Sequence, residues 1–146
     1  MAHLKDLLGD PGAQKNVIAD CVALIDSEVK DKGGLSGMAI KAGYAVVNGV
    51  KPTFVRDAVE HLLPAFSDKL DPVYQEALAD GGDLEKHLAG QRARIADALL
   101  EITDERAKKS KHAAVVKTYE KLRGTAKNNV EAAVPRLATL VKKYHK

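Results

Sequence analysis

Apolar side chains recur at intervals of three and four residues along almost the whole chain, and this spacing limits its fold more than any other feature. One such stripe is formed by Val17, Ile18, Cys21, Ile25 and Val29. A helix places residues three and four apart on one face, whereas a strand places every second residue there. No stretch of this chain alternates for long enough to indicate a strand. The sequence therefore predicts an all-α fold of about seven helices.

Turn-forming residues mark where the predicted helices begin and end. A helix start at Asp10 to Gly12 and the pair Gly33-Gly34 bound the first long helix, and Ser36 is expected to cap the second. The second helix, which ends near Gly49, should carry an apolar stripe toward the core. That stripe is formed by Met38, Ala42, Val46 and Val47.

Prolines and caps divide the rest of the chain. Pro64 predicts a kink or break, and Pro72 the start of a short helix, because proline lacks the amide hydrogen that a helix interior needs. Asp83 should cap one long helix. Two further helices are expected to meet between Gly124 and Asn129.

The chain also contains an internal repeat. The segment IADCVALIDSEVKDK, from Ile18 to Lys32, matches IADALLEITDERAKK, from Ile95 to Lys109, at six of fifteen positions. After a shortening of two residues, Tyr44 matches Tyr119 and Gly49 matches Gly124. Matched acidic residues, tyrosines and glycines are more than two amphipathic helices share by chance.

The repeat predicts two three-helix units within a single domain spanning residues 1–146. The units cover about residues 14–67 and 91–142. Three helices with one apolar stripe each cannot enclose a large core, so the two units should pack together about a pseudo-two-fold axis.

Polar residues occur on the apolar faces at equivalent places in both units. They are Gln14, Glu28 and Tyr44 in the first, and Gln91, Glu105 and Tyr119 in the second. A buried carboxylate is costly unless it is paired or hydrogen-bonded, so the two tyrosines are expected to donate to the two glutamates, with Lys41 or Lys117 as alternative partners. Two interpretations remain open: these residues bind a small ligand between the units, or they only fix how the helices pack.

Charge is distributed unevenly along the chain. Residues 1–104 contain 11 basic and 17 acidic side chains, and residues 105–146 contain 12 basic and 3 acidic ones. The predicted basic surface is formed by Arg106, Lys109, Lys117, Lys121, Lys127, Lys142 and Lys143. It could pair with the acidic part of the same molecule, dock a second copy or an acidic protein, or contact nucleic-acid phosphates or anionic lipid.

The motifs of the common enzyme classes are missing from the sequence. The five histidines do not cluster, and no serine stands in a GxSxG or SxxK pattern. Gly33 to Gly37 lacks the ending of a phosphate-binding loop and is expected to be a tight helix–helix turn. Cys21 is expected in the core, where a thiol is unreactive. We therefore predict no catalytic residue, no metal site and no cofactor, and a protein that is not an enzyme.

The sequence lacks two features that would place the protein in or across a membrane. No apolar run reaches the ~20 residues that a membrane-spanning helix requires, and the first residues do not form a signal peptide. We expect a cytoplasmic protein without a membrane span.

The run KGGLSGMAIKAGYAVVNGVKPTFVRDAVEHLLPAF, followed by LDPVY, resembles the shared core of a family of small all-helical bacterial proteins of uncharacterised function. The resemblance covers nearly the whole chain. It implies a stand-alone helical domain and assigns no activity. The sequence as a whole favours a non-enzymatic interaction or scaffolding module. The alternatives are a nucleic-acid-associated protein that uses the basic last third, and a small-molecule or lipid carrier with a pocket between the repeats.

Overall fold

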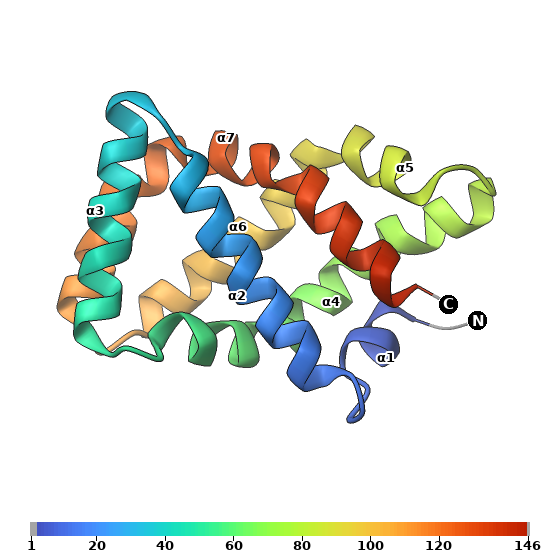
Figure 1. Cartoon of the computed structure of the whole chain (residues 1–146), viewed down its shortest axis with the longest axis horizontal. Coiled ribbons are helices and arrows are strands. Elements are labelled where there is room, and N and C mark those ends of the chain that lie inside the picture. The colour runs from blue at the N-terminus through green and yellow to red at the C-terminus, as the bar shows by residue number, and fades with distance from the viewer. Residues whose placement is uncertain (1–2, 146) are drawn as a thin grey trace.

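The computed structural model describes residues 3–145, with the backbone alone at residues 35 and 36. Within this range the chain forms seven α-helices and no strand, which confirms the all-α prediction (Figure 1). The helices are α1 (Leu4–Leu8), α2 (Gln14–Asp31), α3 (Gly34–Val50), α4 (Phe54–Asp80), α5 (Leu84–Gly90), α6 (Arg92–Lys109) and α7 (Ala113–Tyr144). No helix in this range is long and apolar enough to cross a membrane.

The apolar core lies around α4, which contacts α1, α2, α5 and α6. Its largest side chains with almost no exposed surface are Leu4, Val17, Leu70, Tyr74, Leu88, Ile95, Val134 and Val141. Every helix except α3 contributes a described residue to this core. In Figure 1, α3 stands at one end of the molecule, while α1 and the end of α7 lie at the other.

One turn of α4 holds both ends of the described chain. The Asp71 carboxylate accepts a hydrogen bond from the Leu4 backbone amide at 2.8 Å and contacts His3 Nδ1 at 2.9 Å. Three residues later, the Tyr74 hydroxyl lies 2.6 Å from His145 Nδ1. The five-residue helix α1, which the sequence pattern does not predict, is held in place by the two bonds to Asp71 and by its buried leucines.

Helix α4 is continuous, so of the kink or break predicted at Pro64 the break is wrong, and so is the separate helix at Pro72. Both proline rings are exposed, and so are Glu60 and Asp68, whose carbonyl groups lose their usual helical partner. Because both prolines and these two residues lie on the exposed side of α4, the lost bonds cost less than breaking the buried stripe on its opposite side would.

The predicted long helix after Asp83 is instead two helices, α5 and α6, divided at Gln91. The predicted cap at Asp83 is confirmed, because its Oδ1 accepts the Lys86 amide at 3.2 Å. The expected junction between Gly124 and Asn129 is wrong, since α7 runs through it without interruption. A single glycine costs a helix about 1 kcal/mol, which the packing of α7 against α3, α5 and α6 outweighs.

The first half of the chain has two helices, α3 and α4, where the matching part of the second half has only α7. The prediction of three helices in the second unit, residues 91–142, is therefore wrong, because only α6 and α7 lie there. The pseudo-two-fold arrangement of the two units stays a prediction.

The turn between α2 and α3 is tight, as expected. Gly34 adopts a φ of +70°, a backbone conformation that residues with a side chain rarely adopt. Gly33 precedes α3 as its N-cap residue, so the helix begins two residues before Ser36, whose side chain lies outside the described part of the structure. Helix α2 begins at Gln14, after a turn formed by residues 11–13.

Candidate functional site

The outward side of α3 carries apolar side chains that the other helices leave exposed. Met38 is 68% exposed, Val46 44% and Val50 37%. We call this surface the α3 outer face; it is formed by Met38, Ala39, Ala42, Ala45, Val46, Gly49 and Val50, all of which are exposed. The prediction that Met38, Ala42 and Val46 face the core is wrong.

Helix α3 is oriented by a close approach to α7 on its inward side. A Cβ atom on the buried Gly43 would lie 2.8 Å from Thr118 Cγ2 and 2.9 Å from Leu122 Cδ1. On the same side, the Tyr44 hydroxyl donates to the Asp26 carboxylate of α2. Gly43 and Tyr44 place their side of α3 against the other helices. The apolar stripe that begins at Met38 lies on a different side and therefore faces solvent.

The two repeated tyrosines donate to aspartates rather than to the expected glutamates. Tyr44 donates to Asp26, and the Tyr119 hydroxyl donates to Asp104 Oδ1 at 2.5 Å. In both halves the bond joins a tyrosine to an aspartate near the end of a preceding helix, α2 or α6. Spacing along the chain did not separate the two carboxylates in either half. Asp26 lies two residues before Glu28, and Asp104 lies directly before Glu105, so each tyrosine had an aspartate and a glutamate as candidate acceptors.

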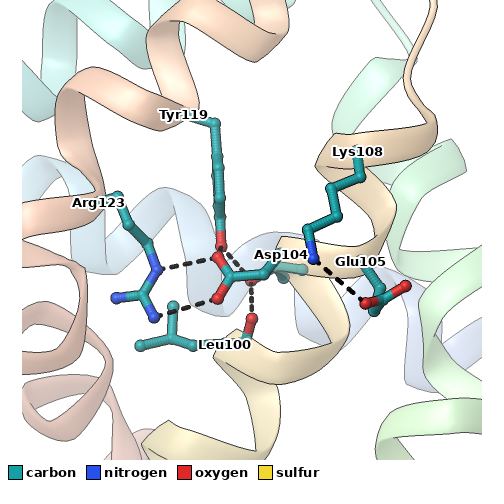
Figure 2. A network of polar contacts seen from close by, with 7 residues as sticks. Leu100, Asp104, Glu105, Lys108, Tyr119 and Arg123 are labelled. Atoms are coloured by element: carbon teal, nitrogen blue, oxygen red, sulfur yellow. Dashed lines mark hydrogen bonds and ion pairs between the residues drawn. The ribbon is translucent and has the colours of Figure 1, made fainter.

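Asp104 is the centre of a small polar network between α6 and α7 (Figure 2). Arg123 Nε donates to its Oδ1 at 2.9 Å, and Arg123 Nη2 donates to its Oδ2 at 3.1 Å. Hydrogen bonds from Arg123 and then from Tyr119 outweigh burial and hold the pKa of the Asp104 carboxyl below its ordinary value. The Thr103 hydroxyl lies 2.7 Å from the Tyr119 hydroxyl, so the donors and acceptors of this network satisfy one another.

The two repeated glutamates lie in different surroundings. Glu28 is largely covered and pairs with Arg136 of α7 at 2.9 Å and with Lys32 at 3.1 Å. Glu105 is 60% exposed and contacts only Lys108, at 3.6 Å, among the described residues. The placement of Glu105 on an apolar face is therefore wrong.

The six polar residues predicted to bind a ligand are not brought together by the fold. Gln14 is the first residue of α2 and lines a shallow 380 Å³ depression beside Pro64 and Ser67. Gln91 lies at the junction of α5 and α6. Gln14 and Glu28 lie at opposite ends of α2, and Gln91 and Glu105 are separated by most of α6. Each pair is therefore about 21 Å apart, which is too far for one small ligand to contact both residues.

Three of the seven residues of the predicted basic surface are paired within the molecule. Lys127 lies 3.1 Å from Asp97, Lys142 3.2 Å from Glu85, and Lys143 2.8 Å from Asp20. Within residues 3–145, no ion pair is formed by Arg106, Lys109, Lys117 or Lys121.

A groove of about 440 Å³ lies between the start of α4, the end of α6 and the start of α7. We call it the basic groove. Its apolar lining is Phe54, Ala58, Leu62, Ala107 and Val115, and its basic lining is Lys51, Arg106, Lys109, Lys111 and His112. Arg106 and Lys109 belong to the predicted basic surface. Lys51 and Phe54 do not, because no local pattern links residues 51–62 to residues 103–119. Lys111 lies between α6 and α7, outside both helices.

Cys21 lies against the core, as predicted. Burial, followed by the nearby Asp20 charge, raises the pKa of its thiol to about 11, so almost none is thiolate at neutral pH. In the part of the chain that the structure describes, no group of three or more His, Cys, Asp or Glu side chains is placed to hold a metal ion.

Comparison with known proteins gives a family without an assigned activity. No curated protein and no solved structure matches the chain. A family model described as "Family of unknown function (DUF6918)" matches residues 4–145, which is nearly the whole sequence. The chain therefore belongs to this family of unknown function, DUF6918.

Proposed function

We propose that this protein is a non-enzymatic interaction module that pairs with a second copy of itself through the α3 outer face. The observation that carries the proposal is the exposure of Met38, Val46 and Val50 on a helix that contributes no described residue to the apolar core. Removing apolar surface from water gains about 25 cal/mol per Å², so a partner that covers this face lowers the free energy of both molecules.

A second copy fits this face in charge and in shape. Helix α3 has one charged residue, Lys41, so two copies can meet with little charge repulsion across the contact. In an antiparallel pairing about an axis near residue 44, Ala42 of one copy would lie opposite Val46 of the other. Met38 would likewise lie opposite Val50. The first contact joins a smaller to a larger side chain, and the second joins the flexible Met38 to the short Val50, which favours interdigitation over collision.

The size of the face sets the expected strength of the dimer. Helix α3 has 17 residues and is about 25 Å long, and one face of it offers less than the roughly 800 Å² per partner that stable dimers bury. We therefore expect a reversible dimer with a dissociation constant on the order of 10 to 100 μM.

Sedimentation equilibrium over a wide range of protein concentrations tests the proposal. The unaltered chain should shift from monomer to dimer, and Ala42→Glu, which places a carboxylate at the centre of the face, should remain monomeric. Ala93→Glu is the matched control, because Ala93 is an exposed alanine on α6, and it should dimerise like the unaltered chain.

The salt dependence of the dimer separates this face from a charge-driven contact. An apolar contact between two molecules of net charge +3 should be unchanged or strengthened by added salt. A dimer that dissociates in high salt, a dimer that survives Ala42→Glu, or a chain that is monomeric at every concentration would each contradict the proposal.

A nucleic-acid role for the basic last third would rest on the four cations of the predicted basic surface that form no ion pair among the described residues. They are Arg106, Lys109, Lys117 and Lys121. Lys127, Lys142 and Lys143 pair with carboxylates of the same molecule, which reduces the charge they can offer to phosphates.

A further inference from the structure

We propose that the basic groove binds a small amphipathic anion, a carboxylate head carried on a hydrocarbon chain. This site is independent of the α3 outer face and shares no residue with it. The proposal stands on three properties of the groove: an excess of positive charge, an apolar lining, and a shape that is present without a ligand.

The positive charge of the groove is uncompensated. Arg106, Lys109 and Lys111 line it, and among the described residues none of them forms an ion pair. The one carboxylate among the lining residues is Asp57, which is already held by Lys51 at 2.7 Å and by the Thr53 hydroxyl at 3.2 Å. Three free cations gathered from the end of α6 and the following turn therefore raise the local concentration of anions.

The lining between these cations is apolar and comes from three helices. Phe54, Ala58 and Leu62 come from α4, Ala107 from α6 and Val115 from α7. A purely ionic ligand such as phosphate would leave this surface in contact with water. A hydrocarbon chain would cover it, and a volume of about 440 Å³ is within the range of small-molecule sites.

The hydroxyl groups in the groove already have hydrogen-bond partners within the protein. The Thr103 and Tyr119 hydroxyls lie 2.7 Å apart, and Tyr119 also donates to Asp104. Ser110 Oγ accepts the backbone amide of His112 at 3.2 Å. These groups offer little to a polar ligand body such as a sugar, whereas the cations remain available to a carboxylate head.

One wall of the groove is fixed by an aromatic contact. The rings of Phe54 and His112 meet edge to face, with centroids 6.1 Å apart and planes at 82°. This contact joins the start of α4 to the turn between α6 and α7, so the groove is formed before a ligand arrives. A preformed site avoids the cost of ordering its walls on binding.

Titration of ¹⁵N-labelled protein with decanoate, kept below its micelle concentration and followed by amide chemical shifts, tests the proposal. Saturable shifts are expected at residues 54–62 and 106–115. Acetate has the same head without the chain, and decyltrimethylammonium has the same chain with a positive head. At the same concentrations, neither should produce these shifts.

Charge variants then locate the head. Changing Arg106, Lys109 and Lys111 together to Gln should weaken decanoate binding at least tenfold. The matched control changes Lys15, Lys117 and Lys121 to Gln, which removes the same charge from exposed positions outside the groove and should change affinity less than twofold. Circular dichroism of both variants serves as the control for correct folding.

A groove-filling variant tests the chain. Ala107→Leu adds bulk to the apolar lining and should weaken decanoate binding severalfold while leaving the three cations in place. Equal binding of acetate, shifts confined to the α3 outer face, or unchanged affinity in the groove triple variant would overturn the proposal. None of these results depends on whether the chain dimerises, because Ala42→Glu protein can be titrated in the same way.

Discussion

Arg123 of α7 and Asp104 of α6 meet through two parallel hydrogen bonds, from Nε to Oδ1 at 2.9 Å and from Nη2 to Oδ2 at 3.1 Å. A bidentate ion pair of this kind restrains the rotation of one helix relative to the other more than a single hydrogen bond does. Tyr119 adds a third donor to the same carboxylate, so the three side chains act as one unit. The unit lies beside the basic groove, whose lining includes Tyr119.

The coupling within this unit is measurable. Tyr119→Phe should lower the free energy of unfolding by about 1.5 kcal/mol, because it removes a hydrogen bond to a partly exposed charged group. In a double-mutant cycle with Arg123→Met, the two changes should be non-additive, since both donors serve Asp104. Urea denaturation followed by circular dichroism provides the values. Strict additivity would show that the two donors act separately.

Stability should fall in acid. Hydrogen bonds from Lys143 and Tyr144 hold the pKa of Asp20 below its ordinary value of 3.8, and those from Arg123 and Tyr119 do the same for Asp104. A carboxyl with a lowered folded pKa contributes stability that is complete above pH 3.8 and is lost as pH falls through the folded pKa. Urea midpoints should therefore be level from pH 7 to about 5 and decrease below pH 4. Asp104→Asn should be less stable at pH 7 and show a shallower acid decrease.

Stability should also fall in alkali. Burial is the largest cause that raises the pKa of Cys21 to about 11, and of Tyr44 and Tyr144 to about 12. The ordinary values are 9.0 and 10.0, so each group contributes stability that is complete below its ordinary pKa and is lost as pH rises through the folded one. Urea midpoints should decrease from pH 9 upward. Tyr44→Phe should flatten this decrease above pH 10, and an unchanged slope would contradict the buried environment of Tyr44.

Two glycines should respond to alanine in opposite directions. Gly124 lies within α7, is exposed and has open space where a Cβ would be, so Gly124→Ala should stabilise the chain by about 1 kcal/mol. Gly43→Ala should destabilise it by about 1 kcal/mol, because the new methyl group would overlap Thr118 and Leu122. Thermal unfolding of both variants provides the comparison. A loss of stability in Gly124→Ala would instead favour the turn that the sequence pattern predicted there.

The sequence predicted helix content well and helix orientation poorly, and α3 shows why. Spacing identifies a helix, but α3 is apolar nearly all round, so the stripe through Met38 and the side containing Gly43 are equally good candidates for the core. The choice is made by how closely Gly43 lets α7 approach, which is a property of two segments that are far apart in the sequence.

Helix boundaries and the candidate sites were predicted only in part, because both depend on tertiary packing between segments that are distant in the sequence. Pro64 and Gly124 disfavour a helix locally, yet tertiary packing carries α4 and α7 through them. The cations of the basic groove were partly found, because Arg106 and Lys109 belong to the basic surface predicted from the uneven charge of the chain. The apolar lining was missed, because Phe54 joins it only through the packing of α4 against α6.

Asp71 and Tyr74, which lie on one turn of α4, bind His3 and His145. These contacts determine which side of the molecule faces a surface to which either terminus is attached. Because Asp71 and Tyr74 keep both described ends at the opposite end of the molecule from α3, a tag or surface linker fused at either terminus directs α3 away from the support (Figure 1). An immobilised layer of this protein would therefore present the α3 outer face to the solution, whichever terminus carries the linker.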